Sequence, residues 1–205
     1  MNMKILCIGR NYADHINELN NERPSEPVIF LKPDTAILKD NEPFYYPDFS
    51  NDIHHEVEIV LKINKIGKNI EAKFAHKYYD EIGVGIDFTA RDLQSKLKEK
   101  SLPWEKAKAF NGSAPISGFV PKTRFTNLQN LNFHLEVNGD VRQKGNTNLM
   151  LWSFDEIIAE ISTYFTLKTG DLVFTGTPVG VGKVIVGDKL TAFIENEEMM
   201  SFEVK

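Results

Sequence analysis

The sequence predicts a β-rich α+β fold whose sheets are mostly antiparallel or mixed. Segments with the pattern of strands outnumber those with the pattern of helices, and the two kinds do not alternate regularly along the chain. No internal repeat, low-complexity tract or long linker divides the 205 residues. A chain of this length can bury one sizeable core, so we expect a single domain over residues 1–205.

The expected strands are short segments rich in apolar and β-branched residues. They cover residues 4–8, 27–32, 53–63, 81–88, 131–137, 141–144, 171–175, 189–195 and 199–205. Asn138 and Gly139 separate two of them and are a strong signal for a two-residue β-hairpin.

Three helices are expected from their start signals. Ser153 and Glu156 form a capping box ahead of an apolar helix that runs to residue 165. Thr89 and Asp92 form a looser version of the same box, before a helix over the following residues. Asn11 would cap a short helix through residue 20, and the polar, proline-marked stretch after it predicts a mobile lid over about residues 11–26.

The segment 53–63 carries the most informative polar residues. Its odd positions are apolar except for His55, so it is typical of a half-buried strand that places His54, Glu56 and Glu58 on the face away from the core. Two carboxylates at about 4 Å repel by roughly 4 kcal/mol at an effective dielectric of 20. Either water on an exposed face screens this repulsion, or a bound cation removes it.

A third acid favours the cation. Asp87 ends an apolar, glycine-containing run between Ile86 and Phe88, where an unpaired carboxylate would be poorly solvated. Three carboxylates with open positions suit Mg²⁺ or Mn²⁺, which prefer oxygen ligands. Zinc is the weaker hypothesis, because cysteine is nearly absent and no pair of histidines has the usual zinc-ligand spacing.

Other polar residues lie at helical spacing. His15 and Glu18 are three residues apart, so the carboxylate can orient the imidazole as a general base. Arg91 and Gln94 have the same spacing and suit a substrate carboxylate, although each pair is also common on exposed helices. Lys106 and Lys108 are two candidates for a cation beside a developing enolate.

Composition excludes several classes of function. The net charge of −5 argues against a nucleic-acid-binding protein, which needs a basic face. No apolar run approaches the length of a membrane span or a signal peptide. Cys7 is the only cysteine, which excludes an internal disulfide and favours a reducing compartment. We therefore expect a cytoplasmic protein. The glycine-rich run 175–183 lacks the spacing of a nucleotide-binding loop, because Lys183 is followed by Val184.

Six segments of the chain carry a resemblance to one family. They read GRNYADH (9–15), FLKP (30–33), HHEVE (54–58), DFTARDLQ (87–94), LPW through Phe110 (102–110) and TGTPVGVG (175–182). In this order they resemble the fumarylacetoacetate hydrolase family, in its short branch of acylpyruvases and oxaloacetate decarboxylases or tautomerases. The resemblance implies a β-rich sandwich or roll and a homodimer.

The resemblance also implies roles for individual residues. The implied metal ligands are Glu56, Glu58 and Asp87. The implied catalytic residues are His15, Glu18 and Lys108, and the implied substrate-binding residues are Arg10, Arg91, Gln94 and Thr177. Lys108 rather than Lys106 matches the family's spacing.

The implied substrate is a small 2-oxo acid or 1,3-dicarbonyl acid that reacts through an enolate. Hydrolysis of the C–C bond of an acylpyruvate is the first expectation, with decarboxylation or keto–enol tautomerisation of oxaloacetate beside it. Two alternatives remain at this point: an isomerase or decarboxylase of the 2-hydroxyhepta-2,4-diene-1,7-dioate type, and a non-catalytic, metal-dependent dicarboxylate-binding protein. The binding protein would not need His15 and Glu18.

Overall fold

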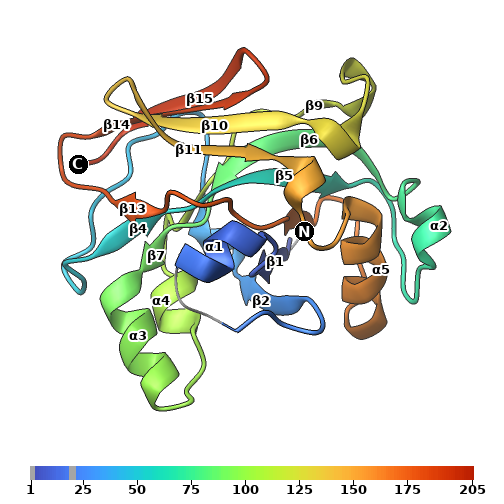
Figure 1. Ribbon diagram of the computed structural model, residues 1–205, viewed down its shortest axis with the longest axis horizontal. Coiled ribbons are helices and arrows are strands. Elements are labelled where there is room, and N and C mark those ends of the chain that lie inside the picture. The colour runs from blue at the N-terminus through green and yellow to red at the C-terminus, as the bar shows by residue number, and fades with distance from the viewer. Residues whose placement is uncertain (1–2, 19–21) are drawn as a thin grey trace.

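A six-stranded sheet forms the centre of the protein (Figure 1). The computed structural model describes residues 3–18 and 22–205. The strand order is β2-β1-β12-β5-β6-β9. In chain order these strands are β1 (Ile5–Gly9), β2 (Val28–Lys32), β5 (Val57–Ile63), β6 (Tyr79–Ile86), β9 (Val120–Pro121) and β12 (Leu172–Phe174). Only the β1–β12 pair is parallel among these neighbours, so the sheet is mixed, as the sequence predicts.

A second sheet of four antiparallel strands lies across the first at the top of Figure 1. Its order is β11-β10-β14-β15, and its strands are β10 (Asn132–Val137), β11 (Asp140–Asn146), β14 (Lys189–Ile194) and β15 (Glu197–Glu203). Asn138 and Gly139 join β10 to β11 with φ values of 56° and 85°, as the hairpin prediction requires. Alternate residues of β10 are buried, so this sheet covers the core with one face.

Short strands form two smaller sheets. The strands β4 (Ile53–His55), β7 (Thr89–Ala90) and β13 (Gly182–Lys183) form one small sheet, and β3 (Ile37–Leu38) pairs with β8 (Ala114–Pro115). Within residues 3–18 and 22–205, four 3-10 turns lie at Asp34–Ala36, Lys122–Arg124, Leu128–Asn130 and Thr147–Leu149.

Five helices surround the sheets in the described part of the chain: α1 (Ala13–Glu18), α2 (Ala72–Ala75), α3 (Arg91–Glu99), α4 (Glu105–Lys108) and α5 (Phe154–Tyr164). Helices α3 and α4 pack together on one side of the molecule, and α2 and α5 on the other (Figure 1). The predicted capping box of α5 is present, with Ser153 accepting from the backbone of Glu156.

Two of the other helix starts differ from the sequence prediction. The N-cap of α3 is Ala90, whose methyl side chain cannot form a cap bond. The predicted cap, Thr89, lies in β7, and its hydroxyl accepts from Lys108. Asn11 does not cap α1. Its buried amide instead donates to the carbonyls of Trp152 and Thr175, which ties the start of α1 to the core. The predicted end of this helix, residues 19 and 20, lies outside the described residues.

The half-buried strand predicted over residues 53–63 is also wrong in detail. It breaks at Glu56 into β4 and β5, and β5 is buried on both faces because apolar residues pack against each face of this central strand. Ile59 packs into the main core, and Val60 packs on the opposite side against Ile5 and Cys7. Glu58 therefore points into a closed interior rather than toward an open sheet face.

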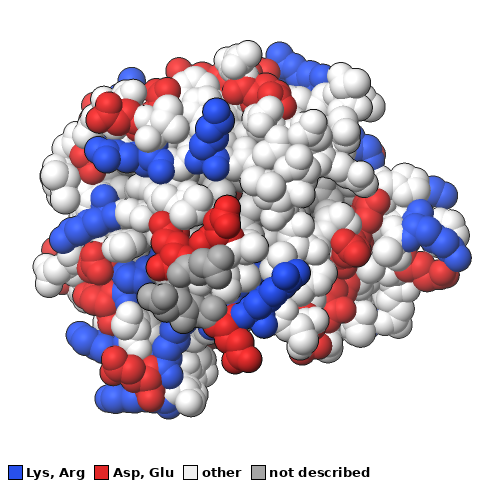
Figure 2. Space-filling model, viewed as in Figure 1, with Lys and Arg blue, Asp and Glu red and all other residues white. Residues whose placement is uncertain are grey.

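The surface fits the predicted charge balance. Lys and Arg side chains alternate with Asp and Glu over the described part of the face in Figure 2 and form no broad basic patch there. None of the helices in the described ranges is long and apolar enough to cross a membrane. The cytoplasmic location stays a prediction.

Candidate metal and active site

Three carboxylates converge where β4, β5 and β6 meet. The antiparallel register pairs Glu58 with Gly85, and the amide N–H of Asp87 donates to the carbonyl of Glu56 at 2.8 Å. Asp87 directly follows β6, so the chain brings it beside the break at Glu56. One oxygen of each of the three side chains lies within 4.8 Å of the others, and all three residues are buried.

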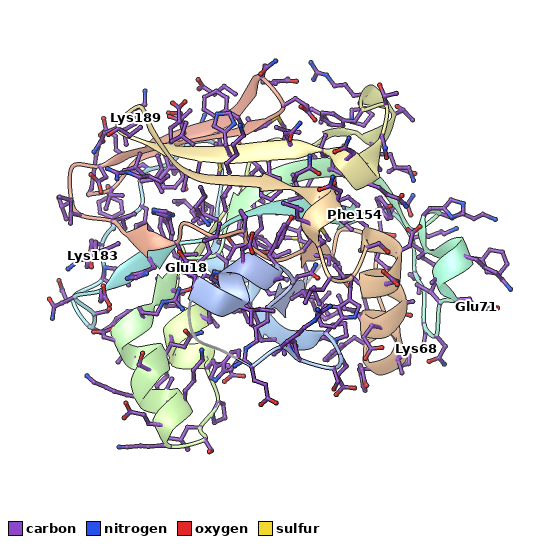
Figure 3. All side chains as sticks on the ribbon, viewed as in Figure 1. Glu18, Lys68, Glu71, Phe154, Lys183 and Lys189 are labelled. Carbon is purple, nitrogen blue, oxygen red and sulfur yellow. The ribbon has the colours of Figure 1, made fainter. Side chains whose placement is uncertain are left out.

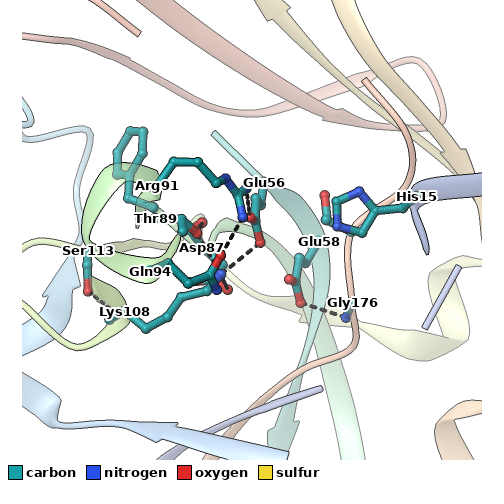
Figure 4. Close-up of polar contacts among 12 residues, drawn as sticks. His15, Glu56, Glu58, Asp87, Thr89, Arg91, Gln94, Lys108, Ser113 and Gly176 are labelled. Atoms are coloured by element: carbon teal, nitrogen blue, oxygen red, sulfur yellow. Dashed lines mark hydrogen bonds and ion pairs between the residues drawn. The ribbon is translucent and has the colours of Figure 1, made fainter. Parts of the chain in front are cut away.

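Cationic side chains surround these acids (Figure 4). Lys108 Nζ lies 2.8 Å from Glu56, 2.6 Å from Asp87 and 2.6 Å from the hydroxyl of Thr89. Arg91 pairs with the other oxygen of Glu56. Lys32 Nζ lies 2.8 Å from Asp87. The buried acids are thus largely neutralised by fixed charges of the protein.

The positive charges neutralise Glu56 more than they neutralise Glu58. Burial raises the pKa of the Glu56 carboxyl, but Lys108 and Arg91 outweigh it, so that this pKa falls well below its usual range. Burial and the nearby Asp87 instead hold the pKa of Glu58 well above its usual range, although Gly176 donates its N–H to it at 2.6 Å. Burial alone lowers the pKa of Lys108, yet Asp87 and Glu56 raise it overall.

The donor set fits a hard divalent cation. Glu58 shares the centre with two other carboxylates and gains no lysine or arginine of its own among the described residues, so additional positive charge would stabilise its ionised form. Three carboxylate oxygens within reach of one point are the ligand type that Mg²⁺ and Mn²⁺ prefer. The roles of these residues as ligands stay predictions.

His15 and Glu18 lie opposite the acids, on α1. The Nδ1 atom of His15 is 3.0 Å from Glu18, and the second oxygen of Glu18 accepts from the amide of Gly180 at 2.9 Å. Figure 3 shows Glu18 at the end of α1 beside the loop that leads to Lys183. The Glu18 carboxylate favours a proton on Nδ1 and leaves Nε2 as the acceptor of the ring.

A small cavity of about 40 Å³ joins the two groups. Its walls contain all ten site residues predicted from the sequence except Glu18, which stands behind His15: Arg10, His15, Glu56, Glu58, Asp87, Arg91, Gln94, Lys108 and Thr177. Larger clefts of about 570 and 640 Å³ lie beside Phe154 and beside Ile185, but neither contains the converging acids.

Each of the predicted substrate-binding residues forms a hydrogen bond within the protein. Gln94 is held by Arg91, whose guanidinium donates to its side-chain oxygen at 2.7 Å. Arg10 follows β1 with a φ of 59° and donates to the carbonyl of Glu22 at 3.3 Å. The hydroxyl of Thr177 donates to the carbonyl of Val57 at 2.9 Å, which commits its proton to the protein.

Two residues predicted from patterns lie outside the cavity. His54 does not share the site with Glu56, because the strand breaks between them, and it contacts Asp52 at 3.0 Å instead. Lys106 is exposed, because the segment forms α4 rather than an extended strand and the two lysines point apart.

Sequence reasoning missed Lys32 and Gln143. Lys32 is fully buried, and its ammonium group contacts the carbonyls of Phe88, Lys108 and Ser113 as well as Asp87. Lys32 follows the apolar run 28–31 of a predicted strand, and this position could have indicated a buried lysine. Gln143 comes from the second sheet, where it accepts from Val57 N–H and donates to Thr177; no sequence pattern marks it.

Comparison with known proteins tests the family resemblance seen in the sequence. The model of the fumarylacetoacetate hydrolase C-terminal domain family matches residues 4–205. The chain belongs to the fumarylacetoacetate hydrolase family. It is 43% identical to "Oxaloacetate tautomerase YcgM" of Escherichia coli over 96% of this chain and 90% of the relative. It is 44% identical to the mitochondrial oxaloacetate decarboxylase of Dictyostelium discoideum over 98% and 93%.

A solved family structure shows the fold in detail. The fumarylpyruvate hydrolase of Pseudomonas aeruginosa, in complex with Mn²⁺ and pyruvate, is 35% identical and superimposes with a TM-score of 0.93 over 98% of this chain and 88% of that one. The predicted family and β-rich α+β fold are therefore confirmed. These relatives are named as an oxaloacetate tautomerase, an oxaloacetate decarboxylase and a fumarylpyruvate hydrolase, all of them enzymes.

Proposed function

We propose that this protein is a metal-dependent enzyme that interconverts the keto and enol forms of oxaloacetate through an enolate. The observation that carries the proposal is the convergence of Glu56, Glu58 and Asp87 in one cavity with Lys108 and His15. The high identity to an oxaloacetate tautomerase and an oxaloacetate decarboxylase supports the choice of substrate.

Each site residue has a proposed role in this reaction. A bound Mg²⁺ or Mn²⁺ would supply Lewis-acid polarisation of the 2-oxo group. Arg91 and Gln94 would bind the adjacent carboxylate. His15 Nε2 would take a proton from C3, while the C–H electrons form the C2–C3 double bond and the carbonyl electrons move to oxygen. The Lys108 ammonium group would stabilise that oxygen, and transfer of a proton from water to the oxygen would complete the enol.

We propose that a wall of the cavity moves when the substrate enters. The cavity is small, at about 40 Å³, and several of the charged side chains in its walls are paired with one another. Helix α1 carries His15 and is fastened to the opposite loop through the contact of Glu18 with Gly180. We propose that α1 is the moving part of the predicted lid, because it carries His15 in the cavity wall and its movement would break the contact of Glu18 with Gly180.

Acylpyruvate hydrolysis is the second candidate, and the His15–Glu18 pair favours it. An oriented imidazole can remove a proton from water, whose oxygen would then bond to the distal carbonyl carbon and expel the pyruvate enolate. Decarboxylation needs the same enolate but no activated water. The isomerase alternative would use the same acids on a longer diacid. A binding protein would have no use for the orienting contact of Glu18.

The test follows the ultraviolet absorbance of the oxaloacetate enol, with acetylpyruvate as a second substrate. With Mg²⁺ or Mn²⁺, the protein should accelerate enol-to-keto conversion, and Glu58→Gln should abolish the acceleration. Glu81→Gln, which changes an acid on β6 away from the cavity, is the control and should keep full activity. Rapid cleavage of acetylpyruvate without an effect on oxaloacetate would replace the first candidate with the second.

We also propose that the protein is a homodimer, as the resemblance implies. Ile185 and Val186 are 58% and 65% exposed beside each other, which suits a surface covered by a second copy. Light scattering after gel filtration tests this proposal: a mass near 47 kDa, twice that of the 23.3 kDa chain, supports it, and a monomer mass contradicts it.

A further inference from the structure

Helix α3 presents a third polar residue to the cavity. Arg91, Gln94 and Lys98 are spaced by three and four residues, which places them on one face of the helix, and all three line the cavity. Lys98 is half-buried, and its ammonium group lies 5.3 Å from the centre of the Trp104 ring. Trp104 also lines the cavity, so this contact keeps the charge at its wall.

Lys98 differs from the neighbouring cations in its partners. Arg91 and Lys108 each pair with Glu56. Lys98 forms no ion pair with any carboxylate of residues 3–18 and 22–205. Burial, together with Arg10, Arg91 and Lys108, lowers the pKa of Lys98 to about 8. A partly buried cation among other cations is unfavourable unless an anion accompanies it.

The charge of the whole cavity points to such an anion. Arg10, Arg91, Lys98 and Lys108 line it opposite the three carboxylates. A divalent cation on those carboxylates would leave the cationic side chains in excess. The cavity would then favour a ligand with more than one negative charge, one at the metal and one at the end of α3.

We propose that Lys98 binds the second carboxylate of a dicarboxylic 2-oxo acid and so makes the site selective for such substrates over monocarboxylic ones. The inference rests on the proposed function, because it assumes that the first carboxylate lies near the metal and Arg91. From there the α3 face leads along Gln94 to Lys98, and we place the far carboxylate of the substrate at that end.

The test compares Lys98→Met with Lys96→Met, a control on the exposed side of the same helix. Lys98→Met should raise the KM for oxaloacetate about tenfold to a hundredfold, as expected for a lost charged hydrogen bond, with kcat within about twofold of wild type. The KM for acetylpyruvate, which has no second carboxylate, should not change. Lys98→Arg should restore most of the affinity for oxaloacetate, which a merely structural role would not explain.

A binding measurement separates this inference from the proposed function. Malate and lactate, the 2-hydroxy analogues of oxaloacetate and pyruvate, differ by the second carboxylate, and their binding with Mg²⁺ is measured by calorimetry. Lys98→Met should weaken malate and leave lactate unchanged, even if the wild-type protein turned over neither substrate and the proposed function failed. Equal weakening of both ligands, or of neither, would overturn the role of Lys98.

Discussion

Removing the charge of Lys32 should destabilise the protein far more than removing a surface lysine. The Lys32 side chain is fully buried, with its ammonium group 2.8 Å from Asp87. Lys32→Met keeps a similar volume but leaves this carboxylate with one cation fewer and the carbonyl of Ser113 without its donor. Breaking a buried ion pair in this way costs about 3–5 kcal/mol, roughly a third of the stability of a typical domain. Lys108 still contacts Asp87, which favours the lower end of the range.

The assay is urea unfolding followed by circular dichroism, first with a chelator and then with Mg²⁺. Lys62→Met is the control, because Lys62 and Glu81 form a half-exposed pair at 2.6 Å and its loss should cost about 1 kcal/mol or less. Mg²⁺ should stabilise Lys32→Met more than wild type, since the metal replaces the lost positive charge beside Asp87. Equal loss of stability in the two variants would refute the assignment of Lys32 as a charge that the buried acids require.

Three further predictions concern the site. Glu58→Gln should abolish stoichiometric Mn²⁺ binding measured by electron paramagnetic resonance; full occupancy of the variant would remove Glu58 from the ligand set. His15→Ala should lower acylpyruvate hydrolysis and oxaloacetate tautomerisation by about 10²–10⁴-fold, whereas decarboxylation should fall less, and wild-type rates in both proton-transfer assays would show that the contact with Glu18 is only structural. Lys98 is cationic below its pKa of about 8, so kcat/KM for oxaloacetate should fall as pH rises through that value, and a pH profile unchanged in Lys98→Met would contradict this reading.

The sequence predicts local structure well where one physical signal dominates. The hairpin at Asn138 and Gly139 forms because the two residues tolerate positive φ, and the helix after Ser153 forms with its capping box. Thr89 shows the limit of such signals. Its predicted cap is absent, because a strand pairing and a hydrogen bond from Lys108 hold it instead.

The acids were accessible to sequence reasoning, but their surroundings were not. Glu56, Glu58 and Asp87 follow from strand alternation and from an acid placed in an apolar run. Lys32 and Gln143 reach the site from segments far away in the chain, 55 residues before Asp87 for the lysine and 86 residues after Val57 for the glutamine. Their positions depend on strand order and on how the two sheets pack, which no local pattern encodes.

The central claim is that the buried acids hold a divalent cation that promotes enolate formation. The most direct measurement is the rate of enol-to-keto conversion of oxaloacetate by wild type and Glu58→Gln, each with saturating Mg²⁺ and with a chelator. We expect acceleration only for wild type with Mg²⁺, and background rates in the other three conditions. Acceleration by the chelated wild type or by Glu58→Gln equal to that of wild type with Mg²⁺ would contradict the claim.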